Sequence, residues 1–328
     1  MIAFNLHRAN GVDDALRHGS ASGAKFIAGG TNLVDLMKAG VETPDMLVDV
    51  SKLPLAAIAT THDGGVSIGA MARNSDVADH PLIRDHYPLL AQALAAGASP
   101  QLRNMATVGG NLLQRTRCHY FYDIGFARCN KRMPGSGCAA VDGRNRQHAI
   151  LGASPACVAV NPSDMSVALH ALDAVVVIRD GSNVKRIPIA NFHRLPGNAP
   201  QNDTNLPHGA LILAVELPKS SVNLASHYLK LRDRASYAFA LVSVAAALHI
   251  DGGRVADARI ALGGVAHRPW RIRAAENALI GKPLNDASIG RATDLLLDGA
   301  RPLSENRFKI ALARQAVRRA LTVAEGTS

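Results

Sequence analysis

The sequence predicts an α+β protein with two domains. Over the first two thirds of the chain, short strand-like apolar runs alternate with runs that have helical spacing. In the last third the strand-like runs come first and the helical runs follow, which is the order of an α+β domain. With 328 residues and 48% hydrophobic content, the chain can bury a full core. The stretch 218–223 is the expected boundary, giving domains of residues 1–222 and 223–328.

The first domain has strands that end at glycine or at polar turn residues. Strands are expected at 26–28, 47–50, 66–69, 174–178 and 211–215. One helix is expected to begin at Asn32, and another to span 89–96. Gly97 and Pro100 end this second helix, because glycine frees the backbone and proline lacks the amide hydrogen.

The second domain is predicted from strands followed by helices. The strands are expected at 228–231 and 255–262, and the helices at 271–279, 287–297 and 305–323. The longest apolar run of the chain, 238–250, contains Ser243 and His249 and is too short to span a bilayer. No membrane insertion is therefore expected.

The formal charge of +10 does not by itself predict nucleic-acid binding. Lys and Arg are spread along the chain, and only five Tyr and seven Phe are available to stack on bases. Such a basic surface can attract an anionic cofactor or an acidic partner subunit, or can simply face solvent. Residues 1–6 lack the charged and apolar regions of a signal peptide, so no targeting signal is expected there.

Two glycine turns of nearly the same composition, 28–33 and 107–112, lie about eighty residues apart. Glycine pairs allow close backbone approach, so that consecutive amides can point at phosphate oxygens. One such turn is more often an ordinary tight turn, but two could close on one extended dinucleotide. Neither turn has the G-x-G-x-x-G pattern of nicotinamide-binding folds or the P-loop pattern of phosphoryl transfer.

The segment 114–157 lacks the apolar periodicity of strands and helices, and it contains the cysteines. A loop of this length needs something besides an apolar core to hold it, and four thiolates can bind zinc or an iron–sulfur cluster. Two disulfides or unrelated buried thiols are the alternatives, and without a secretory signal a metal site is favoured over disulfides. The spacing of the cysteines does not identify the metal. Basic residues that would offset the thiolate charge, or would simply be solvated, are Arg115, Arg117, Arg128, Lys131 and Arg132.

These residues resemble the FAD-binding subunit of the xanthine dehydrogenase family of molybdenum hydroxylases. The segments 28–33, 107–112 and 162–165 carry the resemblance, which covers nearly the whole chain. The segments 263–266 and 269–271 are similar to the terminal domain of the carbon monoxide dehydrogenase flavoprotein. The resemblance implies an FAD-binding domain of the vanillyl-alcohol oxidase type, with two α/β subdomains, followed by that α+β domain.

Within this family the insert 114–157 is most similar to flavoproteins of bacterial periplasmic-type aldehyde oxidoreductases, which carry an additional [4Fe–4S] cluster in this subunit. The resemblance implies that the cluster ligands are Cys118, Cys129, Cys138 and Cys157. The flavoprotein of 4-hydroxybenzoyl-coenzyme A reductase also has a cluster insert, which leaves a reductive enzyme as the alternative. The cluster either lies on the electron path or, as we expect, mainly holds the insert together.

The resemblance also implies which residues contact FAD. They are Lys25, Phe26, Ile27, Ala28, Gly29, Gly30, Thr31, Asn32 and Leu33 in the first turn and Thr107, Gly109, Gly110 and Asn111 in the second. Asp164 would hydrogen-bond a cofactor hydroxyl or ring group. Lys230 would approach the isoalloxazine and Tyr237 would shield one of its faces; otherwise they are a solvated strand lysine and a packing aromatic. No catalytic residue is identified beyond these two candidates.

The activity that the resemblance implies is electron transfer from iron–sulfur clusters through FAD to an external acceptor. An aldehyde would be oxidised at molybdenum in a molybdopterin-binding large subunit, and a small subunit would supply [2Fe–2S] clusters. The complex would be periplasmic, exported on the signal of a partner, or cytoplasmic. The alternatives from other classes are a zinc-stapled assembly module and a free-standing flavin enzyme that binds its own substrate.

Overall fold

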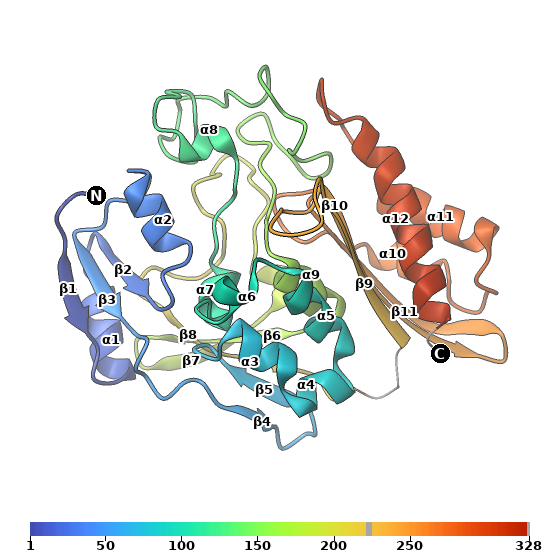
Figure 1. The fold of residues 1–328 in the computed structure, drawn as a ribbon, viewed down its shortest axis with the longest axis horizontal. Helices are drawn as coiled ribbons and strands as arrows, with labels where there is room; N and C mark the ends of the chain where they lie inside the picture. The colour runs from blue at the N-terminus through green and yellow to red at the C-terminus, as the bar shows by residue number, and fades with distance from the viewer. Residues whose placement is uncertain (221–224, 327–328) are drawn as a thin grey trace.

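The computed structural model describes residues 1–220 and 225–326, and Figure 1 shows their arrangement. The chain begins with a three-stranded parallel sheet of order β1-β3-β2. Its strands are β1 (Asn5–Arg8), β2 (Ala24–Ile27) and β3 (Met46–Asp49), and its helices are α1 (Val12–Gly19) and α2 (Leu33–Lys38). Parallel neighbours need crossover connections, and the two helices provide them.

A five-stranded sheet with antiparallel pairing forms the second unit, in the order β4-β5-β8-β6-β7. Its strands are β4 (Ile58–Thr60), β5 (Val66–Gly69), β6 (Val175–Asp180), β7 (Asn183–Pro188) and β8 (Leu211–Leu217). The helical elements between them are α3 (Asn74–Asp79), α4 (Pro81–His86), α5 (Pro88–Ala96), α6 (Pro100–Arg103), α7 (Val108–Leu112), α9 (Asp164–Ala171) and the 3₁₀ turn η1 (Ile189–Asn191). One hydrophobic core joins this sheet to the first, as Val48 and Ile68 both belong to it.

The third unit is an antiparallel sheet of order β11-β10-β9 covered by three helices. The strands are β9 (Ala225–Leu231), β10 (Val242–Asp251) and β11 (Arg254–Gly263), and the helices are α10 (Arg273–Asn277), α11 (Asp286–Leu296) and α12 (Phe308–Glu325). Helix α12 packs on β9 and β10, while α5 and α9 of the preceding unit contact the same sheet. Figure 1 shows this unit, in orange and red, at the opposite side of the molecule from β1.

Strand β10 covers most of the apolar run 238–250, for which no strand was expected. Its side chains alternate between two cores: Val244 and Leu248 join the core under α12, whereas Ala245 and Ala247 join the core of the first domain. A strand that is buried on both faces has no polar alternation, so its sequence reads as one continuous apolar run. The predicted strands and helices are otherwise found within three residues of their expected ends.

The segment between α7 and α9 is largely irregular, as expected. It contains the short helix α8 (His119–Tyr122) and isolated bridges such as Cys129 to Cys138. In Figure 1 this green segment lies near the top of the view, between α2 and α12. The expected domain division at 222/223 lies outside the described residues. Of the helices that the structure describes, none combines the length and apolarity needed to cross a membrane.

Candidate cofactor site

A cavity of about 800 Å³ brings together segments that are far apart in the sequence. Both glycine turns line it, together with the start of α9 and the end of β9. Among the lining residues are Gly29, Gly109, Asp164 and Lys230. A volume of several hundred cubic ångströms suits a bound cofactor. The predicted turns therefore do meet at one cavity.

The first turn requires its glycines. A Cβ atom at Gly29 would collide with the carbonyl oxygen of Met105. Gly30 has a φ of 71°, in the left-handed region that side chains disfavour. The pair lets the chain leave β2, pass close to another backbone segment, and enter α2.

Within the described part of the chain, the backbone amides of this turn are unpaired. Among the described residues, no acceptor receives a hydrogen bond from the backbone amides of Gly29 to Leu33, although the carbonyls of Gly30 and Asn32 accept bonds from Val34 and Leu36. The whole turn lines the cavity. Backbone amides seldom remain unpaired, and successive free amides form a concave site for an anion.

The side chain of Asn32 has a structural role in this arrangement. Its Nδ2 donates to the Tyr122 hydroxyl at 3.2 Å, and its Oδ1 accepts from the Arg115 amide at 2.9 Å. Asn32 thus ties the first turn to the cysteine-containing insert. Because the Asn32 side chain already hydrogen-bonds other residues of the protein, the backbone of the turn is the part that can contact a ligand.

The second turn is different, because it is the short helix α7. The Gly109 amide donates to the Ala70 carbonyl at 2.8 Å, and the Gly110 amide donates to Oγ1 of Thr107 at 3.2 Å. The Asn111 amide donates to the Thr107 carbonyl at 2.8 Å. The expectation that this turn also offers consecutive amides to phosphate is therefore wrong. Its residues line the cavity as a wall whose amides are already bonded.

Lys230 and Asp164 form a buried ion pair at the cavity. Their Nζ and Oδ2 atoms are 2.7 Å apart, and the side chains are 4% and 9% exposed. Lys230 also donates to the Ala96 carbonyl at 3.1 Å. The interpretation of Lys230 as a solvated strand lysine is wrong, since the side chain is buried against its partner.

Tyr228 belongs to the same group, although the sequence analysis did not identify it. Its hydroxyl donates to Oδ1 of Asp164 at 2.7 Å. Burial and the neighbouring carboxylate raise the pKa of Tyr228 well above its usual range, so the hydroxyl keeps its proton. The period of two in a strand places Tyr228 and Lys230 on one face of β9, a signal that could have found it.

Asn74 is a second residue that sequence reasoning missed. It is buried and lines the cavity, and its Oδ1 has no hydrogen-bond partner among the described residues. A buried acceptor without a partner is costly, and Asn74 belongs to the cavity lining, so it is a candidate contact for a ligand donor. No local sequence pattern distinguishes this asparagine from others.

Tyr237 lies at the cavity wall and is 59% exposed. Its φ is 51°, and the Arg234 side chain donates to its carbonyl oxygen from Nε at 3.0 Å. The tyrosine is thus not a core aromatic of this chain. Its expected role beside a flavin face stays a prediction.

The four cysteines are free thiols gathered within the insert. Burial, together with the nearness of Cys157 and Cys129, raises the pKa of Cys118 to about 12. Burial also raises the pKa of Cys157 to about 11, with smaller contributions from Cys138 and Cys129. Among the described residues, no three of these sulfur atoms lie within 4.8 Å of one another. The two-disulfide alternative is therefore not what the structure shows.

The basic residues of the insert mostly serve other partners. Lys131 is buried, and its Nζ contacts the Pro200 carbonyl at 2.7 Å, Oδ1 of Asp203 at 2.5 Å and Nε2 of His267 at 2.8 Å. Arg132 donates to carbonyl oxygens of the insert at 2.7 to 3.0 Å. Lys131 also lowers the pKa of Cys157, against the larger effect of burial. These cations therefore fix the insert through carboxylates and carbonyls.

The remaining basic residues are paired in the same way. Arg115 contacts Glu42 and also Asp203, at 2.9 Å for the latter, and Lys25 contacts Glu42 at 2.6 Å. The other two ion pairs are Arg117 with Asp35 and Arg128 with Asp142, at 2.7 and 3.3 Å. Next to the cysteines, Nε2 of His148 lies 3.1 Å from the Cys118 sulfur.

Family comparison agrees with this geometry. Residues 2–220 match the family described as the FAD binding domain in molybdopterin dehydrogenase, and residues 227–324 match the CO dehydrogenase flavoprotein C-terminal domain. The chain is 51% identical over 317 residues to the aldehyde oxidoreductase FAD-binding subunit PaoB of Escherichia coli, which covers 96% of both chains.

More distant relatives extend the same pattern. The glyceraldehyde dehydrogenase medium chain of Sulfolobus acidocaldarius is 28% identical over 316 residues, covering 96% of this chain and 94% of the relative. The solved carbon monoxide dehydrogenase of Hydrogenophaga pseudoflava contains a chain that is 26% identical, with a TM-score of 0.78 and coverage of 100% of this chain and 99% of that one. The chain therefore belongs to the FAD-binding subunits of the molybdenum-dependent dehydrogenases, the xanthine dehydrogenase family.

Proposed function

We propose that this chain is the FAD-binding, electron-transferring subunit of a molybdenum-dependent aldehyde oxidoreductase. The observation that carries this proposal is the 51% identity, over 96% of both chains, with the aldehyde oxidoreductase subunit of Escherichia coli. The partners would be a molybdopterin-binding large subunit and a [2Fe–2S] small subunit. When bound, FAD supplies a two-electron carrier between one-electron iron–sulfur centres and an external acceptor.

The first glycine turn is the proposed binding site for the pyrophosphate of FAD. The amides from Gly29 to Leu33 have no acceptor among the described residues, and the collision of any Cβ at Gly29 with Met105 fixes the path of the chain. Amides aimed at phosphate oxygens give charge-assisted hydrogen bonds, which are stronger than neutral ones. The second turn would contribute shape, with Asn111 held by a 2.6 Å hydrogen bond from the Ser163 hydroxyl.

The Lys230–Asp164 pair is the proposed polar contact to the isoalloxazine end of the cofactor. Lys230 keeps a fixed cation at the cavity wall, and Asp164 offsets its charge at 2.7 Å. Tyr228 holds the other carboxylate oxygen by donating at 2.7 Å. Since each group restrains the next, the pair meets the ring with little reorganisation.

We further propose that Cys118, Cys129, Cys138 and Cys157 bind a [4Fe–4S] cluster. The names of the family and of its relatives assign FAD to this subunit and no cluster, so the cysteines themselves are the support. At neutral pH, thiols whose pKa values are raised to about 11 and 12 stay protonated unless a metal ion displaces the protons. A cluster would give this sparsely structured insert its internal restraint.

The positions of the sulfur atoms do not match the ligands of a single zinc ion. A single zinc ion with sulfur ligands at about 2.3 Å would hold neighbouring sulfurs about 3.8 Å apart. Among the described residues, no three cysteine sulfurs lie within 4.8 Å of one another. A cluster attaches each cysteine to a different iron, so its ligands stand wider apart.

The complex purified anaerobically with its partners provides the test. We expect visible absorption from flavin and iron, about one FAD and about four iron atoms assigned to this subunit, and aldehyde oxidation by the complex alone. The isolated chain should bind FAD without oxidising aldehydes. Aldehyde turnover by the isolated chain, or a complex without activity on any aldehyde, would contradict the proposed role.

The insert offers a separate test of the cluster. Cys129→Ser should lose the iron assigned to this subunit and make the insert sensitive to protease, while FAD remains bound. Met133→Leu, an exposed change in the same insert, is the matched control and should keep both iron and resistance. A Cys129→Ser protein that lost iron but kept a resistant insert and an intact complex would show that the cluster is not a structural restraint.

A further inference from the structure

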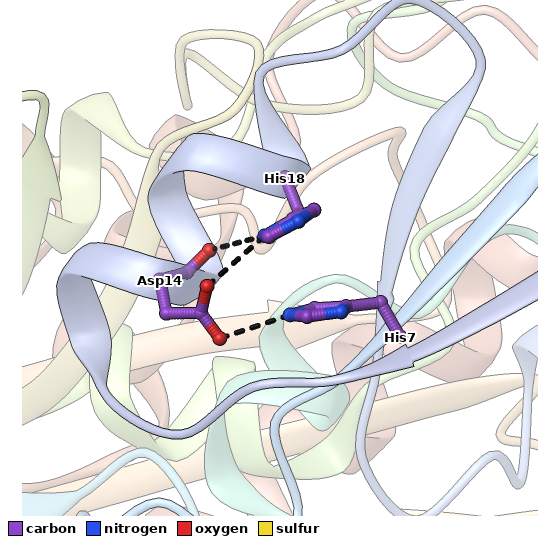
Figure 2. A group of neighbouring side chains, drawn as sticks. All are labelled: His7, Asp14 and His18. Atoms are coloured by element: carbon purple, nitrogen blue, oxygen red, sulfur yellow. Dashed lines mark hydrogen bonds and ion pairs between the residues drawn. The ribbon is translucent and has the colours of Figure 1, made fainter.

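A group of ligand-type side chains lies between α1 and β1, an edge strand of the first sheet (Figure 2). His7 comes from β1, whereas Asp14 and His18 lie one helical turn apart on α1. Residues four apart on a helix share a face, so the carboxylate and one imidazole point together toward β1. None of these three residues lines the flavin cavity.

The donor atoms of the group converge. Nε2 of His7 lies 2.9 Å from Oδ2 of Asp14. Nδ1 of His18 lies 3.2 Å from Oδ1 of Asp14 and 3.0 Å from the Asp14 backbone carbonyl oxygen. One donor atom from each of the three residues can be chosen so that all lie within 4.8 Å of one another. The two imidazole rings stack with centroids 3.6 Å apart and an angle of 22°, and Figure 2 shows one nitrogen of each ring directed at Asp14.

Neighbouring groups hold the carboxylate in place. The Asn10 amide donates to Oδ2 at 3.0 Å, and Nη2 of Arg17 donates to Oδ1 at 3.0 Å. Metal-binding carboxylates and imidazoles are oriented by such outer hydrogen bonds. The side chains of His7 and His18 are 30% and 33% exposed, so an ion and its water ligands can reach the group from solvent.

We propose that His7, Asp14 and His18 form a binding site for a divalent transition metal ion of the zinc, nickel and copper class. Two imidazole nitrogens and one carboxylate oxygen are the donors that such ions prefer, whereas magnesium and calcium prefer oxygen alone. Water completes the coordination from the solvent side. The site is separate from the cysteines and from the flavin.

The bound ion would clamp an edge strand. Among the strands that the structure describes, β1 pairs only with β3, and the ion would join it to α1 as well. Because the same sheet carries β2 and the free amides that follow it, the ion would stabilise the subdomain that presents the first glycine turn. An ion that binds only the folded state raises stability in proportion to the logarithm of its concentration.

Copper binding to the assembled complex, with its full flavin and iron content, tests the site. Cu²⁺ added to one equivalent should give an electron paramagnetic resonance spectrum with hyperfine splitting from two nitrogens, and Zn²⁺ should displace it. His18→Gln keeps a side chain that can hydrogen-bond Asp14, and we expect it to weaken binding by about tenfold or more. His62→Gln, at an exposed histidine elsewhere, should leave binding unchanged.

Thermal unfolding gives a second readout. Zn²⁺ should raise the Tm of the parent complex and of His62→Gln but not that of His18→Gln, while all three should melt alike without metal. If the parent protein binds no ion above the level of His18→Gln, or shows no nitrogen splitting, the three residues form only a hydrogen-bonded group and the proposal fails.

Discussion

The two glycine turns have nearly the same residues and face the same cavity, yet they differ in whether the protein supplies acceptors for their backbone amides. In the first turn, the amides from Gly29 to Leu33 have no acceptor among the described residues. In the second, the amides of Gly109 and Gly110 are bonded to Ala70 and Thr107. The difference lies in the surroundings, since a neighbouring strand end and a capping threonine meet only the second turn. A glycine pattern therefore shows where a backbone can approach a ligand, and the local acceptors decide whether it binds one.

The largest expected effect comes from adding one methyl group to the first turn. Gly29→Ala would drive its Cβ into the Met105 carbonyl, so the turn must move. If two amide–phosphate hydrogen bonds are lost, at about 1.5–3 kcal/mol each, FAD affinity falls by about a hundredfold or more. The measurement is the molar ratio of FAD to protein, obtained by releasing the flavin from the purified variant and from the parent protein.

The matched control is Gly110→Ala in the second turn. There a new Cβ would meet only Oγ1 of Thr107, at 3.1 Å, and alanine is the better helix former. We expect its FAD content to match that of the parent protein. Equal loss of FAD in both variants would mean that the turns act alike and would remove the distinction between them.

The next largest effect concerns the ion pair at the far end of the cavity. Lys230→Met leaves the buried Asp164 without its cation, and breaking such a pair costs about 3–5 kcal/mol. Adding Asp164→Asn should recover much of the lost free energy of unfolding. Denaturant titration of these two variants, the Asp164→Asn single variant and the parent protein completes a double-mutant cycle. If the changes in the free energy of unfolding for the two single variants simply add up to that of the double variant, the two side chains are not coupled.

The free energy of unfolding should depend on pH through a buried histidine that contacts the second turn. His193 is buried and contacts the Leu112 carbonyl at the end of α7 through Nε2 at 3.0 Å. Burial lowers the pKa of His193 to about 4, from an ordinary value of about 6.5. Between these values the unfolded chain binds more protons than the folded protein, so the free energy of unfolding falls as the pH falls.

The loss attributable to His193 amounts to at most about 3.5 kcal/mol, because one pKa unit corresponds to about 1.4 kcal/mol. His193→Gln keeps a donor toward Leu112 without the titration, and its stability should fall less between pH 6.5 and 4. Denaturant titrations across this range compare the two proteins. Identical slopes would exclude His193 as a source of the acid sensitivity.

The smallest expected effect is the loss of the helix cap in the second turn. Thr107→Ala removes the oxygen that accepts from the Gly110 amide, at a cost of about 1 kcal/mol. Thr107→Ser keeps that oxygen and should keep the stability. FAD content should be unchanged in both, and a loss of FAD confined to Thr107→Ala would assign the threonine a direct contact with the cofactor.

Much of the fold could be predicted from the sequence, because local apolar patterns marked most strands and helices. β10 could not, since a strand buried on both faces shows no alternation. Both glycine turns, Asp164 and Lys230 were identified as cavity residues, whereas other lining residues, such as Leu206 to Ile212, were not. What no local pattern reveals is which acceptors surround each turn: Ala70, which holds the Gly109 amide, precedes it by 39 positions. The pairing of Asp164 with Lys230 likewise depends on contact between distant elements.

Amide hydrogen exchange with and without FAD tests the central claim most directly. The amides from Gly29 to Leu33 should exchange quickly in the flavin-free protein and become protected when FAD binds. Those of Gly109 to Asn111 should be protected in both states, because the protein already supplies their acceptors. Unchanged exchange at the first turn on FAD binding, or new protection confined to the second, would contradict the account.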